Sequence, residues 1–327
     1  MLTAKLNRAR IAHLPTPIEP MDRLSAHLGG PRLLVKRDDE TGLATGGNKA
    51  RKLEFLVGQA LADNADVLVT GGAPQSNHAR QTAAAAARFG LGAVLVLRGQ
   101  KPATCTGNLL LNMLLGAEIR WAGERDLDQS IDQAADELRH AGRRPAVVPY
   151  GGSNMLGAAG YVAAMEELVE QQAHSKLAID VIVFASSSGG TQAGLMVGAK
   201  QCGFAGRVLG ISVDKPAGAL ATRVATLANE TAGFLELPWA FAPADIDVND
   251  HYLGGGYAVI GEAEREAINL FARIEGLLLD PVYTGRAAAG LIDLVRRGDL
   301  AGETVLFWHT GGTAGLFGFG EQVLTRW

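Results

Sequence analysis

The chain is poor in the features that secretion, thiolate metal binding or nucleic-acid binding require. Its two cysteines, Cys105 and Cys202, lie far apart and in no CxxC spacing, which argues against a disulfide framework and a cysteine-based zinc site. The formal net charge is −4, and no long run of lysine and arginine offers a footprint for a nucleic acid or an anionic membrane. These absences predict a reduced, cytoplasmic protein that holds no metal and whose partner is a small molecule.

Long apolar segments and nucleotide-binding motifs are also missing. The N-terminus lacks the apolar core of a signal peptide, and no later stretch reaches the roughly 18 uninterrupted apolar residues of a membrane span. Each Gly-x-Gly pair is followed three residues later by leucine or valine, so the fingerprint GxGxxG never occurs. No Gly-Lys dipeptide exists either. The sequence therefore argues against a membrane protein, a dinucleotide-binding enzyme and a P-loop enzyme.

The chain does contain a regular alternation of short β-branched runs and segments with helical spacing. Its 327 residues are 47% hydrophobic, which gives ample core, and the length favours about two domains. The alternation predicts the α/β class with parallel strands. Strands are expected at 33–36, 66–70, 93–97, 146–149, 181–185, 208–213 and 304–308. Helices are expected at 53–61, 79–88, 127–140, 158–171, 192–201, 262–274 and 287–296.

Four of the expected strands end in a turn rich in glycine and serine, just before a helix or a helical pattern. The four turns read TGGAPQSN, PYGGSN, ASSSGGTQ and HTGGTAG. Ligands of open parallel sheets bind beyond the carboxyl ends of the strands, where all four turns would gather. For any single turn, the glycines could equally serve only to make the chain bend. The set of four favours a composite ligand site.

Three short runs at such junctions together indicate a pyridoxal-phosphate site. GGNKARK places Lys49, Arg51 and Lys52 at the start of a helix. Cations are mildly unfavourable at this positive end of the helix unless an anion neutralises them. QSNHARQ supplies a hydroxyl, an amide and an imidazole in consecutive positions, and SSSGGTQAG supplies a backbone loop of the kind that holds phosphate. For GGNKARK alone, a solvated basic turn would be the simpler interpretation.

The same runs resemble those of a known family, the fold-type II pyridoxal-phosphate enzymes. The group in question contains D-cysteine desulfhydrase, L-cysteate sulfo-lyase and 1-aminocyclopropane-1-carboxylate deaminase. The resemblance covers almost the whole chain, and is carried by LPTPIEPMDRLS, VKRDDETGLATGGNKARKLEFL, QSNHARQTAA, LLLDPVYTGRAAAGLIDL and FWHTGG. It implies a homodimer of chains with two open, mostly parallel twisted sheets, helices lying on both faces. The order of the motifs predicts a large cofactor-binding domain, 1–49 and 158–327, and a small inserted domain, 50–157, because Lys49 and Ser188 flank the inserted segment while Ser76 and Asn77 lie within it.

The resemblance assigns a role to each residue around the cofactor, pyridoxal 5'-phosphate. Lys49 would form the Schiff base, Lys52 would reach the phosphate, and Asn77 would bind the 3'-oxygen of the ring. Thr310 would be a neutral hydroxyl partner of the ring nitrogen. The residues expected to form the phosphate loop are Ser187, Ser188, Gly189, Gly190 and Thr191.

The resemblance also places five side chains on the substrate face. Ser76 would bind the substrate carboxylate or handle a proton, together with Asn77 and His78, although a serine there can equally be a helix N-cap. His78 taken alone would more often be a packed or surface residue. Tyr257 and Tyr283, which could be simple buried aromatics, would line the reacting face and complete the catalytic set with Lys49 and Ser76.

Two departures from the deaminase pattern point to the chemistry. The deaminases carry glutamine at the position of His78 and glutamate at the position of Thr284, where the glutamate pairs with the ring nitrogen. The sequence therefore favours a β-elimination that releases sulfide from D-cysteine, giving pyruvate and ammonia. L-cysteate sulfo-lyase is the first alternative and the cyclopropane deaminase the second. A non-catalytic small-molecule sensor on the same fold is the alternative outside enzymes.

Overall fold

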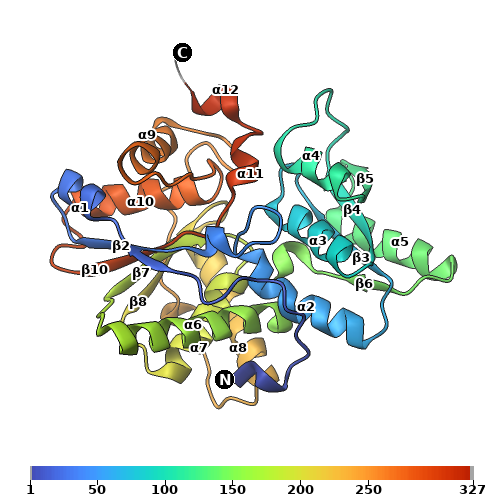
Figure 1. Cartoon of the computed structure of the whole chain (residues 1–327), viewed down its shortest axis with the longest axis horizontal. Coiled ribbons are helices and arrows are strands. Elements are labelled where there is room, and N and C mark those ends of the chain that lie inside the picture. Colours follow the sequence, from blue (N-terminus) through green and yellow to red (C-terminus); the bar gives the residue numbers. More distant parts are fainter. Residues whose placement is uncertain (1, 325–327) are drawn as a thin grey trace.

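The computed structural model describes residues 2–324 and contains two sheets with helices packed on both faces (Figure 1). The six-stranded sheet has the order β1-β2-β10-β7-β8-β9 and is parallel except for its edge strand β1. Its strands are β1 Ile18–Pro20, β2 Arg32–Lys36, β7 Val181–Ser186, β8 Arg207–Ser212, β9 Val248–Asn249 and β10 Thr304–Trp308. The fold class expected from the sequence is confirmed.

The four-stranded sheet is fully parallel and has the order β5-β4-β3-β6. Its strands are β3 Val67–Gly72, β4 Gly92–Arg98, β5 Glu118–Gly123 and β6 Pro145–Val147. All four lie within the expected inserted domain, 50–157. The division into two domains stays a prediction, because helix α2 packs against helices of both parts, α3 and α6.

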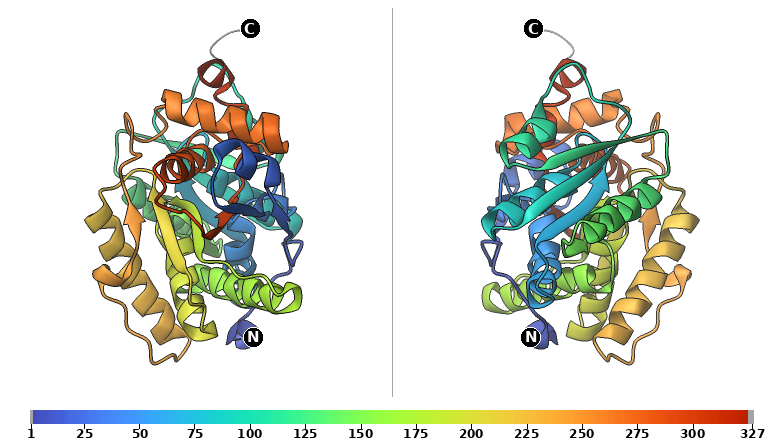
Figure 2. Two further views of the ribbon diagram at one scale, coloured as in Figure 1. Left: turned by 90° about the vertical axis from the view of Figure 1, so that its left-hand side faces the viewer. Right: turned by 90° about the vertical axis from the view of Figure 1, so that its right-hand side faces the viewer.

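The helices cover both faces of each sheet, as the two side views make clear (Figure 2). Helices α1, α9 and α10 lie on one face of the six-stranded sheet, and α6, α7 and α8 lie on the other. The helices are α1 Asp22–Leu28, α2 Lys49–Ala62, α3 Asn77–Arg88, α4 Gly107–Leu114, α5 Leu127–His140, α6 Met155–Ser175, α7 Gly190–Cys202, α8 Ala217–Phe234, α9 Glu262–Leu270, α10 Thr284–Arg296, α11 Thr313–Leu316 and α12 Gly320–Val323. Short turns are the 3-10 helices η1 Leu2–Lys5, η2 Asp38–Glu40, η3 Tyr150–Gly152 and η4 Pro243–Asp245, and the π-helix η5 Phe271–Glu275.

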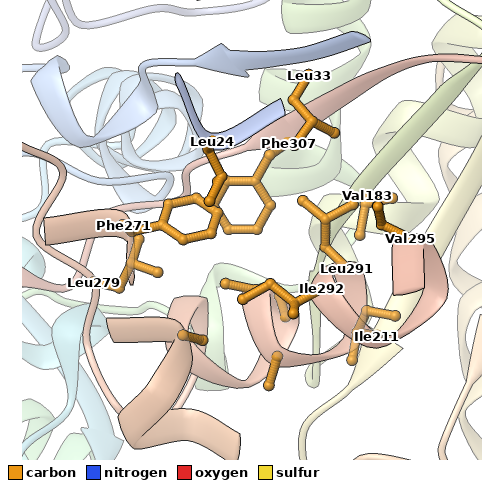
Figure 3. Close-up of a cluster of buried hydrophobic side chains, with 14 of the residues drawn as sticks. Leu24, Leu33, Val183, Ile211, Phe271, Leu279, Leu291, Ile292, Val295 and Phe307 are labelled. Carbon is orange, nitrogen blue, oxygen red and sulfur yellow. The ribbon is translucent and has the colours of Figure 1, made fainter. Parts of the chain in front are cut away.

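One core of the six-stranded sheet is an apolar layer between the strands and α10 (Figure 3), and a second lies between the strands and helices α6 and α7. Leu291 and Ile292 of α10 face Leu33 and Val183 of the sheet, while the rings of Phe271 and Phe307 pack at a centroid distance of 5.2 Å. Full burial of one such side chain contributes roughly 1.5–3 kcal/mol. This packing fixes α10, whose first turn borders the candidate site described below.

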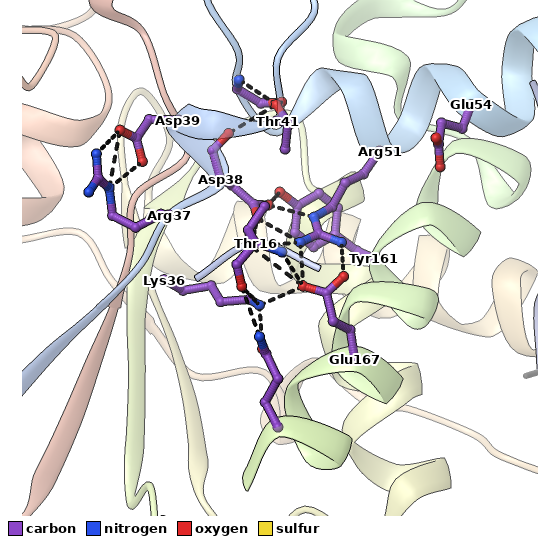
Figure 4. A network of polar contacts seen from close by, with 12 residues as sticks. Thr16, Lys36, Arg37, Asp38, Asp39, Thr41, Arg51, Glu54, Tyr161 and Glu167 are labelled. Atoms are coloured by element: carbon purple, nitrogen blue, oxygen red, sulfur yellow. Dashed lines mark hydrogen bonds and ion pairs between the residues drawn. The ribbon is translucent and has the colours of Figure 1, made fainter. Parts of the chain in front are cut away.

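Helix α2 is held against the six-stranded sheet by a network of buried charges (Figure 4). Arg51 donates to Asp38, at 2.8 Å from Nη2, and to Glu167 of α6, at 3.0 Å from Nη1. Tyr161 donates to the same Asp38 carboxylate at 2.6 Å, and Lys36 of β2 pairs with Glu167. Helices α6 and α2 also approach each other closely, since a Cβ on Gly160 of α6 would lie 2.4 Å from the carbonyl oxygen of Arg51 in α2. The network therefore fixes where α2 begins.

All seven expected strands and all seven expected helices are present, with shifts at their ends. Helix α5 has the expected bounds, because Asp126 caps it and Leu127, Ile131 and Ala134 recur on its buried face. The helix expected over 262–274 instead changes at Phe271 from α to a π-helical turn. Strands β1, β5 and β9 and helices α1, α4, α8, α11 and α12 were not expected. Among residues 2–324, no helix combines the length and apolar character needed to cross a membrane.

Candidate active site

A cavity opens where strands of both sheets end, at the start of helices α2, α3 and α7. The turns after β3, β6, β7 and β10 all reach it, as the four glycine- and serine-rich motifs predicted. Its lining residues are Asn48, Lys49, Ser76, Asn77, His78, Tyr150, Gly151, Ala185, Ser186, Ser187, Ser188, Gly189, Thr191, Tyr283, Thr310 and Gly311. Of the expected site residues, Lys52, Gly190 and Tyr257 are not in the lining. Lys52 contacts Gly151 and Tyr257 contacts Tyr283, which both line it, and Gly190 lies between the lining residues Gly189 and Thr191.

Lys49 is the first residue of α2 and follows a turn that only glycine can make. Gly46 and Gly47 have φ of 69° and 122°, and a Cβ on Gly46 would lie 1.8 Å from the carbonyl oxygen of Asp39. The Lys49 ammonium donates to Asn48 at 3.1 Å. Burial lowers the pKa of Lys49 to about 8, against the opposing charge of Asp280. A lysine with this pKa is partly neutral near physiological pH, the form in which an amine is nucleophilic.

Lys52 lies beside the loop that leads into α7. Its ammonium donates to the carbonyl oxygen of Gly151 at 3.1 Å and to Ser153 at 3.2 Å. The Ser153 hydroxyl also contacts Ser188 at 2.7 Å and accepts from the amide of Gly190 at 3.2 Å. Burial, followed by the charge of Lys49, lowers the pKa of Lys52 well below its usual value. The loop thus combines a buried cation with the positive end of a helix.

The geometry of this loop fits a phosphate group. Gly189 has φ of 89°, and Gly190 begins the 13-residue helix α7, whose first amides lack partners within the helix. A Cβ on Gly190 would lie 2.6 Å from the Ser153 hydroxyl and 2.8 Å from the Lys52 ammonium. Any larger residue at Gly190 would therefore displace the Lys52 ammonium and the Ser153 hydroxyl from the loop. Arg223 of α8 braces the loop by donating to the carbonyl oxygen of Ser188 at 2.8 Å.

Asn77 reaches the cavity with its amide orientation already set. Its Oδ1 accepts from Asn108 at 2.9 Å and from Arg80 at 3.4 Å. The Nδ2 group is therefore the end that remains available to donate to a ligand oxygen. Arg80 also donates to the carbonyl oxygen of Gly46 at 2.8 Å, which links the Asn77 helix to the Lys49 turn. Burial lowers the pKa of Arg80 to about 10.

Ser76 and His78 flank Asn77 and are both buried at the cavity wall. Ser76 is the N-cap of α3, since its hydroxyl accepts from the amide of Ala79 at 3.1 Å, so the capping alternative is correct for its local role. The His78 Nε2 lies 2.9 Å from the Thr70 hydroxyl, which itself donates to the carbonyl oxygen of Val148. Nε2 must therefore carry the proton. Burial and the nearby lysines hold the pKa of His78 well below its usual value, so the ring is neutral.

Tyr283 of the cavity lining meets a second tyrosine, Tyr257. The hydroxyls of Tyr257 and Tyr283 lie 2.7 Å apart, and burial raises the pKa of both phenols. Thr284, which follows Tyr283, turns away from the cavity and donates to Asp280 at 2.8 Å. Asp280 also accepts from the backbone amides of Val282, Tyr283 and Thr284, so its oxygens are occupied. Neither Asp280 nor Thr284 is in the lining.

Several neighbours of the site were not assigned from the sequence. Tyr150, Gly151 and Ser153 belong to the PYGGSN turn, which the sequence marked as a ligand turn without giving its residues roles. Asn108 and Arg80 gave no signal, because their contacts join α3 to α4 and to the Lys49 turn across 28 or more residues of chain. In the described part of the chain, the cavity lining contains no aspartate or glutamate.

Comparisons with known proteins agree with this site. The family model described as pyridoxal-phosphate dependent enzyme matches residues 10–311. A D-cysteine desulfhydrase of Klebsiella pneumoniae (strain 342) is 42% identical, over 95% of this chain and 96% of that protein. A 1-aminocyclopropane-1-carboxylate deaminase of Burkholderia vietnamiensis is 41% identical, over 94% of each.

Solved structures give the same result. The crystal structure of a homologue of that deaminase superposes with a TM-score of 0.92 at 40% identity, covering 99% of this chain and 97% of that one. A fungal L-serine ammonia-lyase from Rhizomucor miehei shares the fold alone, with a TM-score of 0.69 at 18% identity, over 96% of this chain and 99% of that chain.

Proposed function

The chain belongs to the pyridoxal-phosphate-dependent enzymes, within the lyases of the D-cysteine desulfhydrase and 1-aminocyclopropane-1-carboxylate deaminase group, and we propose that its substrate is D-cysteine. In the proposed reaction D-cysteine and water give pyruvate, hydrogen sulfide and ammonia. The Cα–H and Cβ–S bonds break, sulfur leaves with the bonding pair as hydrosulfide, and water then replaces the nitrogen at Cα. No oxidant or reductant is consumed.

The observation that carries the choice of D-cysteine is the absence of a carboxylate from the described cavity lining. Opening a cyclopropane ring requires a strongly electron-withdrawing ring nitrogen, which a neighbouring carboxylate would keep protonated. Here the candidate partner is the Thr310 hydroxyl, and Thr284 is engaged by Asp280. Loss of a sulfur leaving group from Cβ needs less electron withdrawal, so a neutral partner is compatible with it.

The residues of the cavity have the types and positions needed to hold pyridoxal 5'-phosphate. When bound, the cofactor supplies an electron sink for charge that develops at the substrate Cα. In the proposal, Lys49 anchors it, and Lys52 with the loop from Ser187 to Thr191 binds its phosphate. Asn77 donates its free amide to the 3'-oxygen, and Thr310 contacts the ring nitrogen. The close approach of the Lys52 ammonium to Gly190, at the first turn of α7, supports the phosphate assignment.

The remaining side chains act on the substrate. In the proposal, the amides at the start of α3 and the Ser76 hydroxyl bind the substrate carboxylate, since the positive end of a helix favours an anion. Lys49, once free, takes the Cα proton at its Nζ atom. Neutral His78 and Tyr283, whose hydroxyl meets that of Tyr257, also line the cavity, and in the proposal they hold the leaving group and exclude water.

One substrate panel tests this proposal. The purified holoenzyme is given D-cysteine, L-cysteine, L-cysteate and 1-aminocyclopropane-1-carboxylate in separate assays. Pyruvate, 2-oxobutyrate, sulfide and sulfite are measured, with Lys49→Ala as the inactive control. We expect pyruvate and sulfide from D-cysteine and little 2-oxobutyrate. Sulfite from L-cysteate as the main product would identify a sulfo-lyase, and efficient 2-oxobutyrate release a deaminase. No turnover with a filled cofactor site would favour the sensor.

We further propose that the protein is a cytoplasmic homodimer with a small domain over 50–157. The resemblance to the family supports the dimer, the order of the motifs supports the inserted domain, and the low cysteine content supports a reducing compartment. Light scattering at assay concentrations measures the molecular mass directly. A mass near 34.2 kDa, that of one chain, would contradict the dimer.

A further inference from the structure

Arg286 is a fully buried arginine that the reaction outlined above does not use. It lies in the first turn of α10, three residues after Tyr283, and its side chain is shielded from solvent. Its Nε donates to Glu264 of α9 at 2.9 Å. Glu264 in turn accepts from the amide of Gly261 at 3.0 Å, so its second oxygen is also engaged. The charge of Arg286 is therefore paired within the protein.

The other donors of the same guanidinium hold three backbone carbonyl groups. Nη1 donates to Val213 at 2.7 Å and to Gly256 at 3.1 Å, and Nη2 donates to Val259 at 2.9 Å. Gly256 and Val259 lie on either side of Tyr257. The planar fork of one arginine thus fixes the backbone both before and after the tyrosine whose hydroxyl meets that of Tyr283.

The loop held in this way has a backbone that needs such support. Gly254, Gly256 and Ala258 have φ of 55°, 112° and 61°, all in the left-handed region. Ala258 carries a Cβ, so its conformation costs energy and persists only where the surroundings impose it. The Arg286 bonds to the carbonyl groups of Gly256 and Val259 bracket Ala258. Within residues 2–324, no other side chain forms a hydrogen bond with the backbone from Gly254 to Ile260.

We propose that Arg286 is a positioning residue, which sets the Tyr257 hydroxyl against that of Tyr283 for the reaction. Tyr283 and Arg286 both lie at the start of α10. Arg286 therefore fixes the position of the Tyr257 loop relative to the helix that carries Tyr283. Lysine has one ammonium with three donors and no planar fork, so it cannot reproduce four bonds in these directions. The inference rests on the proposed role of the two tyrosines at the reacting face.

The test is a double-substitution cycle of Arg286→Lys with Tyr257→Phe in the holoenzyme. Arg286→Lys keeps the charge beside Glu264 and removes the fork. We expect kcat to fall about tenfold, with KM changed by less than about twofold, because misplacing a reacting group affects the barrier more than binding. In the Tyr257→Phe background, the same substitution should have little further effect on kcat.

The control is Arg296→Lys, which changes an exposed arginine of the same helix that pairs with Glu266 and should leave kcat unchanged. Hydrogen exchange of the amides from Gly254 to Ile260 gives a readout without substrate, and should quicken in Arg286→Lys alone. If Arg286→Lys does not fold, Glu264→Gln replaces it, because it weakens the hydrogen bond to the Arg286 Nε atom. The same fall in kcat and the same faster exchange are expected, both smaller than in Arg286→Lys.

Two results would overturn the proposal. One is an equal fall in kcat in both backgrounds, which would give Arg286 a general structural role. The other is faster exchange in the loop with no change in kcat. The cycle uses whichever of the four panel substrates turns over fastest, so failure of D-cysteine as substrate contradicts the proposed function and leaves this test intact.

Discussion

Two groups of buried charges flank the start of helix α2, and they differ in whether the protein itself neutralises them. On the side of the six-stranded sheet, the Arg51 guanidinium is answered by the carboxylates of Asp38 and Glu167 (Figure 4). Burial alone would raise the pKa of Asp38, but the Arg51 charge and its hydrogen bonds bring it below the usual value. This group is complete without any ligand.

On the cavity side, two buried cations and one half-buried cation have no such partners. The described residues form no ion pair with Lys49, Lys52 or Arg80, whose hydrogen bonds go to amides, hydroxyls and carbonyl groups. Burial lowers the pKa of all three. Uncompensated buried charge destabilises a folded protein, so it is retained where an anion arrives from outside. The comparison distinguishes charges that build the scaffold from charges that serve a ligand.

The largest expected effect is on turnover, from Lys49→Ala. Removing the amine eliminates both the covalent anchor for the cofactor and the proposed base, so the rate should fall by roughly 10²–10⁴-fold or more. Borohydride reduction of the wild-type holoenzyme should fix the cofactor to Lys49, as peptide mapping would detect. Lys200→Ala, an exposed lysine, is the control. Label on another residue would contradict the assignment.

Removing Arg51 from its ion pairs with Asp38 and Glu167 should lower the free energy of unfolding. Arg51→Leu leaves the buried Asp38 carboxylate without its ion-pair partner and Glu167 with Lys36 alone, and we expect the free energy of unfolding to fall by about 3–5 kcal/mol. Urea unfolding of the cofactor-free protein measures it. Arg120→Leu, which breaks exposed pairs, should cost less than about 1 kcal/mol. Equal losses in the two variants would contradict the distinction drawn above.

The pH dependence of the Arg51 effect has a definite sign. The folded-state pKa values of Asp38 and Glu167 are below their ordinary values, so their stabilising contribution is present above the pKa of the unfolded chain. It is lost as the pH falls through the folded values, in the acid range. The stability gap between wild type and Arg51→Leu should therefore be largest near neutral pH and shrink in acid.

Removing a cation from the cavity should weaken cofactor binding without lowering the stability of the cofactor-free protein, in contrast to Arg51→Leu. Lys52→Met should weaken cofactor affinity by roughly 1.5–3 kcal/mol, the value of a charge-assisted phosphate contact. The cofactor-free protein should be no less stable than wild type, because its folded state disfavours the charge on Lys52. Fluorescence titration and urea unfolding provide the two values. A destabilised protein with unchanged cofactor affinity would make Lys52 part of the scaffold.

The smallest effect is a shift along the pH axis. Because burial lowers the pKa of Lys49 to about 8, the apoenzyme should gain its reactive neutral amine as the pH rises through that value. The rate of cofactor uptake, followed by absorbance, should then have its midpoint near pH 8. A midpoint near 10.5, the ordinary value for lysine, would mean that Lys49 is solvated in the cofactor-free protein.

Much of the scaffold could be predicted from local pattern. Buried parallel strands such as Val181–Ser186 are continuous apolar runs, and α5 repeats Leu127, Ile131 and Ala134 at helical spacing. Strand β5 was not predicted, because it is an edge strand whose residues are mostly half-exposed and form no continuous apolar run. Helix α8 could have been found, since Leu220, Val224 and Leu227 follow the same helical spacing. Strands β1 and β9, of two or three residues, give no period to read.

The sequence by itself determined which chemical groups stand at the ends of strands, because chain direction and alternation place those turns on one edge of a sheet. Only the tertiary structure decided how the groups are held. Asn108 fixes Asn77 from another helix, and Arg286 clamps the loop of Tyr257 from 27 to 30 residues away in the chain. Such contacts join segments whose local patterns are independent, so no spacing in the sequence records them. The pKa of Lys49 is likewise a property of burial, which exists only after the two sheets have packed around it.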